Sequence, residues 1–208
     1  MGKAGAIKKT VFATERERDD IRVARDAWRE WQKTCDVSKL VFLDETSATT
    51  DLIRKYGRAK GGLRYLDDAP GGHWKTMTFI AGLRLSGMTA PWCLDAAVDG
   101  DIFKHYLQTQ LAPTLNCGDI VVCDNLSSHK VAGVREIVEG TGATLLYLPP
   151  YSPDLNPIEQ AFSKLKILLR KAMARSFDAL CEAIARILRL FKPDECGNYI
   201  SNSGYDRI

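Results

Sequence analysis

Three acidic residues, Asp44, Asp124 and Glu159, stand where their side chains could share one chemical task. Asp44 follows the apolar run at 40–43, and Asp124 follows the apolar run at 120–123. Continuous apolar runs of this length are typical of strands buried on both faces, and the carboxyl ends of such strands lie at the sheet edge where α/β proteins bind ligands. We therefore expect the two aspartates to lie close together at one edge of a sheet.

Two carboxylates held close together repel each other, and one of them takes up a proton unless a cation lies between them. Oxygen ligands favour Mg²⁺ or Mn²⁺ over zinc, and Mg²⁺ binds one or two carboxylates while water and phosphate oxygens fill its other positions. Glu159 is the best placed third carboxylate, because it opens an expected helix directly after Asn156 and Pro157. These residues predict a divalent metal site with Asp44, Asp124 and Glu159 as ligands.

Each of these acids also has a purely structural interpretation. Residues 156–159 match a capping box with proline at the first helical position, in which Glu159 would serve the helix alone. Asp44 and Asp124 would equally suit turns or caps at strand ends, and Glu45 competes with Asp44 for any role. Local patterns alone leave both interpretations open.

The elements expected to position these acids are strands and helices in mixed order, which predicts an α/β domain with a hairpin turn at Ser86 and Gly87. The expected strands cover residues 40–43, 75–85, 88–97, 120–123 and 144–148, and the expected helices cover residues 15–33, 102–111, 131–139, 157–174 and 177–191. The first helix would pack through an apolar stripe formed by Ile21, Val23, Ala24, Ala27, Trp28 and Trp31.

Composition indicates one substantial hydrophobic core, because 45% of the 208 residues are hydrophobic. The apolar runs are strand-sized and residues 1–9 lack the apolar core of a secretory signal, so we expect a cytoplasmic protein. Six cysteines form no Cys-x-x-Cys pair, so neither a zinc site nor a disulfide framework is indicated. The net charge is only +3, but residues 160–192 hold eight basic and two acidic residues, which suits either a polyanion partner or a solvated helical face.

Three segments around the acids carry a resemblance to a known family: LDET at 43–46, VCDNLSSHK at 122–130 and LPPYSPDLNPIE at 148–159. They closely resemble the DDE transposases of bacterial insertion sequences, in the mariner-like superfamily and specifically of the insertion-sequence six-thirty type. Glu159 also follows Asp124 at the interval that this family shows. The resemblance extends over residues 24–190, roughly the whole of the expected α/β domain.

This resemblance implies a ribonuclease H-like fold, a mixed sheet flanked by helices. It assigns Asp44, Asp124 and Glu159 as the catalytic, metal-binding triad, with Glu45 as a neighbour rather than a member. The implied cofactor is Mg²⁺ or Mn²⁺, as two ions. The implied reaction is cleavage of phosphodiester bonds at transposon ends, followed by transfer of the 3′ hydroxyl into target DNA.

The partners implied by the family are double-stranded DNA, in the form of terminal inverted repeats and a TA target, and further copies of the chain in a homo-oligomer on that DNA. The expected place of action is the bacterial nucleoid within the cytoplasm. We expect a helical arm at 1–38, a catalytic domain at 39–192 and a tail at 193–208. Family members carry a helix-turn-helix region ahead of the catalytic domain, and we expect that region to lie outside this chain.

Asn125, His129 and Lys130 closely follow Asp124 and are expected to contact the scissile phosphate or to orient a ligand. The alternative for these residues is an ordinary polar turn that caps a helix. Either role places them beside the proposed metal site.

A second group of expected DNA contacts lies on the helix that begins near Glu159. Lys166 and Arg170 recur at helical spacing with Glu159 and Ser163, which predicts a basic track for phosphate contacts. Arg58, in a glycine-rich basic loop, is a similar candidate, with a solvated loop as its alternative.

Two other functions fit the same residues. A structure-specific or RNA-hybrid nuclease would use the same fold and metals but would not join DNA ends. A non-catalytic DNA-binding remnant of a decayed element would bind DNA without cutting it, although all three acids are present.

Overall fold

The computed structural model describes residues 14–52, 61 and 74–205. A five-stranded mixed sheet forms its centre, with strand order β3-β2-β1-β4-β5. β1 pairs antiparallel with β2 and parallel with β4, so it is the strand at which the sheet changes direction. The strands are β1 (Leu40–Thr49), β2 (Thr76–Arg84), β3 (Gly87–Leu94), β4 (Ile120–Cys123) and β5 (Thr144–Tyr147).

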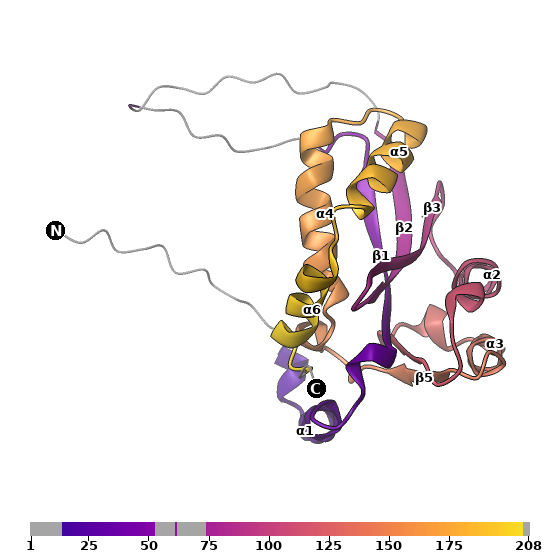
Figure 1. The fold of residues 1–208 in the computed structure, drawn as a ribbon, viewed down its shortest axis with the longest axis vertical. Helices are drawn as coiled ribbons and strands as arrows, with labels where there is room; N and C mark the ends of the chain where they lie inside the picture. The colour runs from indigo at the N-terminus through magenta and orange to yellow at the C-terminus, as the bar shows by residue number, and fades with distance from the viewer. Residues whose placement is uncertain (1–13, 53–60, 62–73, 206–208) are drawn as a thin grey trace.

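Helices cover both faces of this sheet, with α4, α5 and α6 on one face and α2 and α3 on the other (Figure 1). None of the described helices is both long enough and apolar enough to span a bilayer. The α-helices are α1 (Asp19–Gln32), α2 (Gly100–Tyr106), α3 (Val134–Glu139), α4 (Ile158–Ala172), α5 (Phe177–Leu188) and α6 (Pro193–Asn202). A π-helical turn, Leu107–Leu111, continues α2, and single 3-10 turns lie at Thr14–Glu17, Val37–Lys39, Ala112–Thr114, Ser127–Lys130 and Pro153–Leu155.

The first half of β1 is buried on both faces, as its apolar sequence predicts. Phe42 packs into the core beneath α4 and α5, whereas Leu43 packs into the core beneath α2 and α3. Leu43 lies opposite Cys123 in the parallel register of β1 and β4. The next residue of each strand is an aspartate, so the register places Asp44 beside Asp124.

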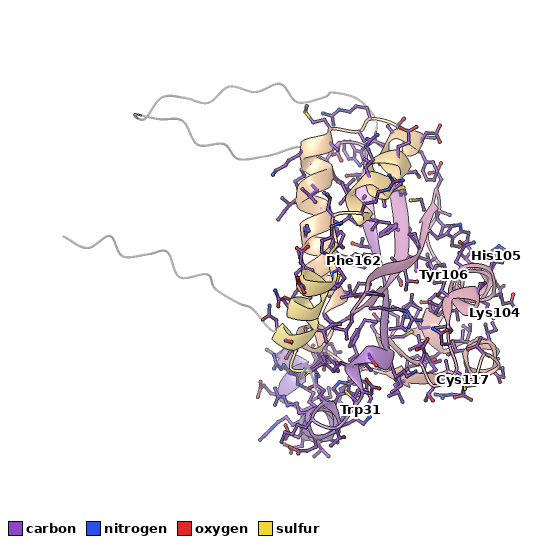
Figure 2. All side chains as sticks on the ribbon, in the orientation of Figure 1. Trp31, Lys104, His105, Tyr106, Cys117 and Phe162 are labelled. Carbon is purple, nitrogen blue, oxygen red and sulfur yellow. The ribbon has the colours of Figure 1, made fainter. Side chains whose placement is uncertain are left out.

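The apolar face of α4 anchors the helix that carries Glu159. Its buried residues follow the predicted periodicity: Ile158, Ala161, Phe162, Leu165 and Leu169. Phe162 points from α4 toward the sheet, where its ring meets the ring of Phe79 edge-on at 6.0 Å (Figure 2). On the opposite face of the sheet, Tyr106 fills the second core and donates a hydrogen bond to the carbonyl of Ala90 at 2.8 Å (Figure 2).

The chain after residue 192, expected to be a tail, folds into α6 and joins the core. Cys196 and Ile200 are fully buried, and the hydroxyl of Tyr205 donates to the carbonyl of Leu155 at 2.9 Å. This stretch therefore supports the loop before α4. The domain division itself stays a prediction.

The buried face of α1 differs from the expected apolar stripe. Ile21, Arg25 and Gln32 are buried, whereas Val23 is 69% exposed. The face is set by polar partners as well as by apolar ones, because Gln32 donates to the carbonyl of Ser203 at 2.9 Å. An arginine and a glutamine therefore lie where the sequence pattern led us to expect valine and alanine.

Candidate active site

Asp44 is held at the end of the buried half of β1 with both carboxylate oxygens occupied. Its Oδ1 accepts a hydrogen bond from the backbone N–H of Glu45 at 2.8 Å, and its Oδ2 accepts one from Nδ2 of Asn156 at 2.8 Å. Only 7% of the residue is exposed. The loop before α4 therefore fixes the Asp44 side chain in the middle of β1.

Asp124, Asp44 and Glu159 line one pocket of about 440 Å³. They come from the ends of β4, the middle of β1 and the first turn of α4, three elements far apart in the sequence. The rest of the lining consists of Asn125, Leu126, Leu148, Pro149, Pro150, Tyr151, Ser152, Pro153 and Asn156. The three acids singled out from the sequence thus meet in one cavity, while their catalytic role stays a prediction.

The electrostatics of the pocket favour a cation. Burial, together with the negative charges of Glu159 and Asp124, raises the pKa of Asp44 from 3.8 to about 8. The ionised form of Asp44 is therefore unfavourable at neutral pH unless a positive charge lies nearby.

The donor atoms of the pocket suit a hard divalent cation, because they are oxygens. Besides the three carboxylates, the amide oxygens of Asn125 and Asn156 are buried without a hydrogen-bond partner. Across residues 14–52, 61 and 74–205, no group of three His, Cys, Asp or Glu side chains is drawn together tightly enough to enclose an ion. Spaced carboxylates fit Mg²⁺ nonetheless, since this ion retains several water ligands and takes few from the protein.

His129 joins two acids on neighbouring strands. Its Nδ1 lies 2.6 Å from Oδ1 of Asp124, and its Nε2 lies 2.9 Å from Oε2 of Glu45. Burial alone would lower the pKa of His129, but the hydrogen bonds to Asp124 and Glu45 outweigh burial and raise the pKa to about 9. The ring is therefore a cation at neutral pH and donates one hydrogen bond to each acid.

The surroundings of His129 fit the expected role of orienting a ligand. It has no exposed surface, its ring stacks on Phe103 with centroids 4.1 Å apart, and its carbonyl accepts a hydrogen bond from the hydroxyl of Tyr147 at 2.6 Å. Because the side chain is buried, it faces Asp124 and Glu45 rather than solvent, and its expected contact with a DNA phosphate stays a prediction. The geometry matches the alternative role of orienting a ligand, namely Asp124.

The capping box suggested by residues 156–159 does not form. No side chain caps α4, because Asn156 turns its amide toward Asp44 instead. Glu159 stays exposed in the first turn and faces the pocket. The structural interpretation of Glu159 as a cap partner is therefore wrong.

A sequence model of the family described as DDE superfamily endonuclease matches residues 39–181, well over half of the chain. The chain belongs to this family. A search of curated proteins gave no significant match for this DDE endonuclease.

Solved structures share the fold of this DDE endonuclease. The strand transfer complex of Mos1 aligns with a TM-score of 0.75 at 18% identity, over 98% of this chain and 64% of that chain. The Mos1 mariner paired end complex with Mn aligns with a TM-score of 0.73 at 19% identity, over 98% of this chain and 64% of that chain. A pre-cleavage Mos1 transpososome aligns with a TM-score of 0.68 at 16% identity, over 98% of this chain and 68% of that chain. The expected ribonuclease H-like fold is confirmed, and the chain spans just under two thirds of the first of these relatives.

The remaining expected DNA contacts of the DDE endonuclease occupy different places. Asn125 lines the pocket beside Asp124. Lys130 lies on the surface above the ring of Tyr147, 5.4 Å from its centroid, and does not line the pocket. Lys166 and Arg170 keep partial solvent access and are not among the buried residues of α4. Arg58 lies outside the described residues.

Sequence reasoning missed the contacts that hold the loop between β5 and α4. The buried side chain of Arg25 donates to Oγ of Ser152 at 2.6 Å and to Oδ2 of Asp154 at 2.7 Å. The signal was present, because Arg25 stands four residues after Ile21 and three before Trp28 on one helical face. A charged residue in the middle of such a face predicts a buried partner.

Proposed function

We propose that this DDE endonuclease is the catalytic part of a DNA transposase, with Asp44, Asp124 and Glu159 as its catalytic triad. The observation that carries the proposal is the convergence of these three acids, from β1, β4 and α4, on one pocket. The Mos1 proteins that share the fold are described as a transpososome and a strand transfer complex, which supports the choice of transposition over simple hydrolysis.

The metal that this site would hold is Mg²⁺ or Mn²⁺, as two ions. Asp44, Asp124 and Glu159 would be the ligands, and the unpartnered oxygens of Asn125 and Asn156 supply further acceptors for bound water. When bound, such a pair activates a water or a 3′ hydroxyl as nucleophile and stabilises the departing oxygen. One related Mos1 complex was solved with Mn and another with Mg, which supports this choice of ions.

The chain's own residues prepare the site for that chemistry. Asn156 holds Asp44 by one oxygen, and His129 holds Asp124 by one oxygen. Oδ1 of Asp124 also accepts from the backbone N–H of Leu126, so Oδ2 is the oxygen of Asp124 that would bind a cation. Each oxygen of Asp44 accepts one hydrogen bond and keeps a further lone pair for a cation. Preorganised ligands of this kind need no rearrangement during the reaction.

The proposed substrate is double-stranded DNA, first the terminal inverted repeats and then a TA target. Lys166 and Arg170 lie on the same helix as Glu159, so they would contact phosphates as the duplex leaves the pocket. We further propose that copies of the chain form a homo-oligomer on DNA, acting at the nucleoid of a bacterial cell. The Mos1 complexes described as paired-end assemblies support a protein that brings two DNA ends together.

The test is cleavage of a 3′ end-labelled duplex carrying the inverted repeats that flank the reading frame. We expect a nick at the repeat boundary with Mg²⁺ or Mn²⁺ for the wild-type chain, and none for Asp124→Asn. Equal cleavage by both proteins would refute the triad. Cleavage without any joined product would favour the nuclease alternative, and DNA binding without cleavage would favour a non-catalytic remnant.

A further inference from the structure

Three sulfur atoms meet between the sheet and α5, outside the pocket of the three acids. Sγ of Cys181 on α5 donates a hydrogen bond to Sδ of Met77 on β2 at 3.8 Å. The thiol of Cys93 on β3 is hydrogen-bonded to Cys181 as well. None of these residues lines the catalytic pocket. Cys181 is therefore the centre of a sulfur cluster that consists of Met77, Cys93 and Cys181.

The register of the sheet places Met77 and Cys93 on one face. Cys93 lies opposite Phe79 in the antiparallel pairing of β2 and β3, and Met77 stands two residues before Phe79 on β2. Residues two apart on a strand point to the same face, and diagonal neighbours on paired strands lie within reach of long side chains. All three members of the sulfur cluster belong to the core that α4 and α5 cover (Figure 1). Packed strands and a helix therefore hold the three sulfurs in place.

The spacing of two of these sulfurs matches that of two ligands on one metal ion. At a metal–sulfur distance of about 2.3 Å, two sulfurs of a tetrahedral or trigonal site lie about 3.8–4.0 Å apart. Sγ of Cys181 and Sδ of Met77 are separated by 3.8 Å. Met77 is only 1% exposed, whereas Cys93 and Cys181 are both partly exposed. The two cysteines therefore give an ion a path from solvent, and Met77 closes the inner side.

We propose that Met77, Cys93 and Cys181 form a binding site for a single Cu⁺ ion with three sulfur ligands. Binding breaks the S–H bonds of both cysteines and releases the two protons to solvent. Two copper–thiolate bonds form, together with one bond to the neutral thioether of Met77. The oxidation state of copper and sulfur does not change, so no oxidant or reductant takes part. The bound ion would connect β2, β3 and α5.

The ligand set favours Cu⁺ over Zn²⁺. Thiolate and thioether sulfurs are soft ligands, which select Cu⁺. Structural zinc sites take four ligands from Cys, His, Asp and Glu, and within residues 14–52, 61 and 74–205 no third side chain of these kinds joins the two cysteines in a group that could hold an ion. Burial and the hydrogen bond to Cys181 raise the pKa of Cys93 to about 12, so this thiol keeps its proton at neutral pH until a metal displaces it.

The test is anaerobic titration of the whole chain with Cu⁺, kept reduced by ascorbate, in competition with the coloured chelator bicinchoninate. We expect the wild type to bind a single Cu⁺ tightly. Cys93→Ser and Cys181→Ser should each weaken binding by more than about 100-fold, because loss of a group that merely supports a metal ligand already costs ~10- to 100-fold. Met77→Leu should weaken it by about 10-fold. Cys117→Ser removes an exposed thiol outside the sulfur cluster and is the matched control, with unchanged affinity.

X-ray absorption of the copper-loaded chain separates this site from unspecific binding to thiols. The spectrum should show three sulfurs at about 2.3 Å in the wild type and two in Met77→Leu. Met77→Leu keeps the test decisive even where a serine variant fails to fold, because leucine and methionine have similar volumes. Equal affinity of Met77→Leu and wild type would overturn the site, as would tighter binding of Zn²⁺ than of Cu⁺ or a loss in Cys117→Ser as large as in Cys181→Ser. No DNA enters the titration, so its result is independent of the proposed function.

Discussion

His129 donates from Nδ1 to Oδ1 of Asp124 across 2.6 Å, and this contact joins the end of β4 to the 3-10 turn that follows it. The same ring reaches Glu45 on β1 through Nε2. One buried cation thus pairs with two acids and sets the orientation of Asp124. Glu45 does not line the pocket, but this contact gives it a role, because its carboxylate pairs with the ring that orients Asp124.

Removal of the His129 ring should destabilise the protein strongly. We expect His129→Ala to lower the free energy of unfolding by roughly 3 kcal/mol, because breaking a buried ion pair leaves its partners uncompensated. Denaturant titration of the metal-free protein measures this change. Lys130→Ala, at the exposed neighbouring position, is the matched control and should alter stability by less than about 0.5 kcal/mol. An effect of His129→Ala no larger than that of the control would contradict the assignment.

The stability of the metal-free protein should fall as the pH rises from about 6.5 to about 9. His129 has a folded-state pKa of about 9 against 6.5 when unfolded, so its contribution is complete below pH 6.5 and is lost as the pH passes 9. Asp44 acts in the same direction, because its folded-state pKa of about 8 exceeds the ordinary 3.8 and the folded protein keeps a proton that the unfolded chain releases. Calorimetric melting across this pH range tests the sign.

Asp44→Asn supplies the control for that pH dependence. The variant lacks the carboxyl that resists ionisation, so the metal-free melting temperature at pH 8 should rise, by about 2–4 °C for each kcal/mol gained. The decline between pH 4 and 8 should also become flatter. A melting temperature that increases with pH in the wild-type protein would show that one or both pKa directions are wrong.

Divalent metal should stabilise the wild-type protein and compete with the Asp44 proton. At 100 times its dissociation constant, Mg²⁺ or Mn²⁺ should add about 2.7 kcal/mol to the free energy of unfolding. Affinity should increase with pH until about 8, where Asp44 loses its proton without help, and then level off. Titration calorimetry at several pH values measures this dependence. In Asp124→Asn, metal should raise the free energy of unfolding much less. An equal increase in both proteins would show that the metal binds outside the pocket.

Arg25 should matter for stability far more than its neighbours on α1. Arg25→Met removes a buried guanidinium that bonds Ser152 and Asp154, and we expect a loss of roughly 3 kcal/mol. Arg29→Ala is the matched control, because Arg29 forms only an exposed pair with Asp26, worth about 0.5 kcal/mol or less. Thermal melting of the two variants compares them. Similar losses for both would mean that Arg25 does not brace the loop.

How far the sequence could predict this structure depends on the range of the interactions involved. The bounds of β4 were predictable, because an apolar run that stops at an acid is a local pattern. The role of Asn156 was not predictable, because its local partner would be the first turn of α4 while its actual partner, Asp44, lies 112 positions away. Local rules therefore favoured the capping box, and a tertiary hydrogen bond overrode it.

The same distinction explains the errors at the two ends of the chain. Arg25 was excluded from the buried face of α1 because its neutralising partner, Asp154, is 129 positions away. Residues 193–208 were expected to be a tail, yet Cys196 and Ile200 are buried against the rest of the core, far along the chain from most of the residues that they pack with. The three acids were found from the sequence because strand ends and a long motif marked them, and His129 was expected beside them; the hydrogen bond from Asn156 to Asp44 was not expected.

The central claim, that three acids of this DDE endonuclease catalyse joining of DNA ends, is tested most directly by strand transfer. A labelled duplex with a free 3′ hydroxyl at the end of the inverted repeat is incubated with plasmid, Mg²⁺ and the wild-type chain, Asp124→Asn or Glu159→Gln. We expect labelled plasmid with the wild-type chain and none with either variant. Equal joining by the variants, or hydrolysis by the wild-type chain with no joined product, would contradict it.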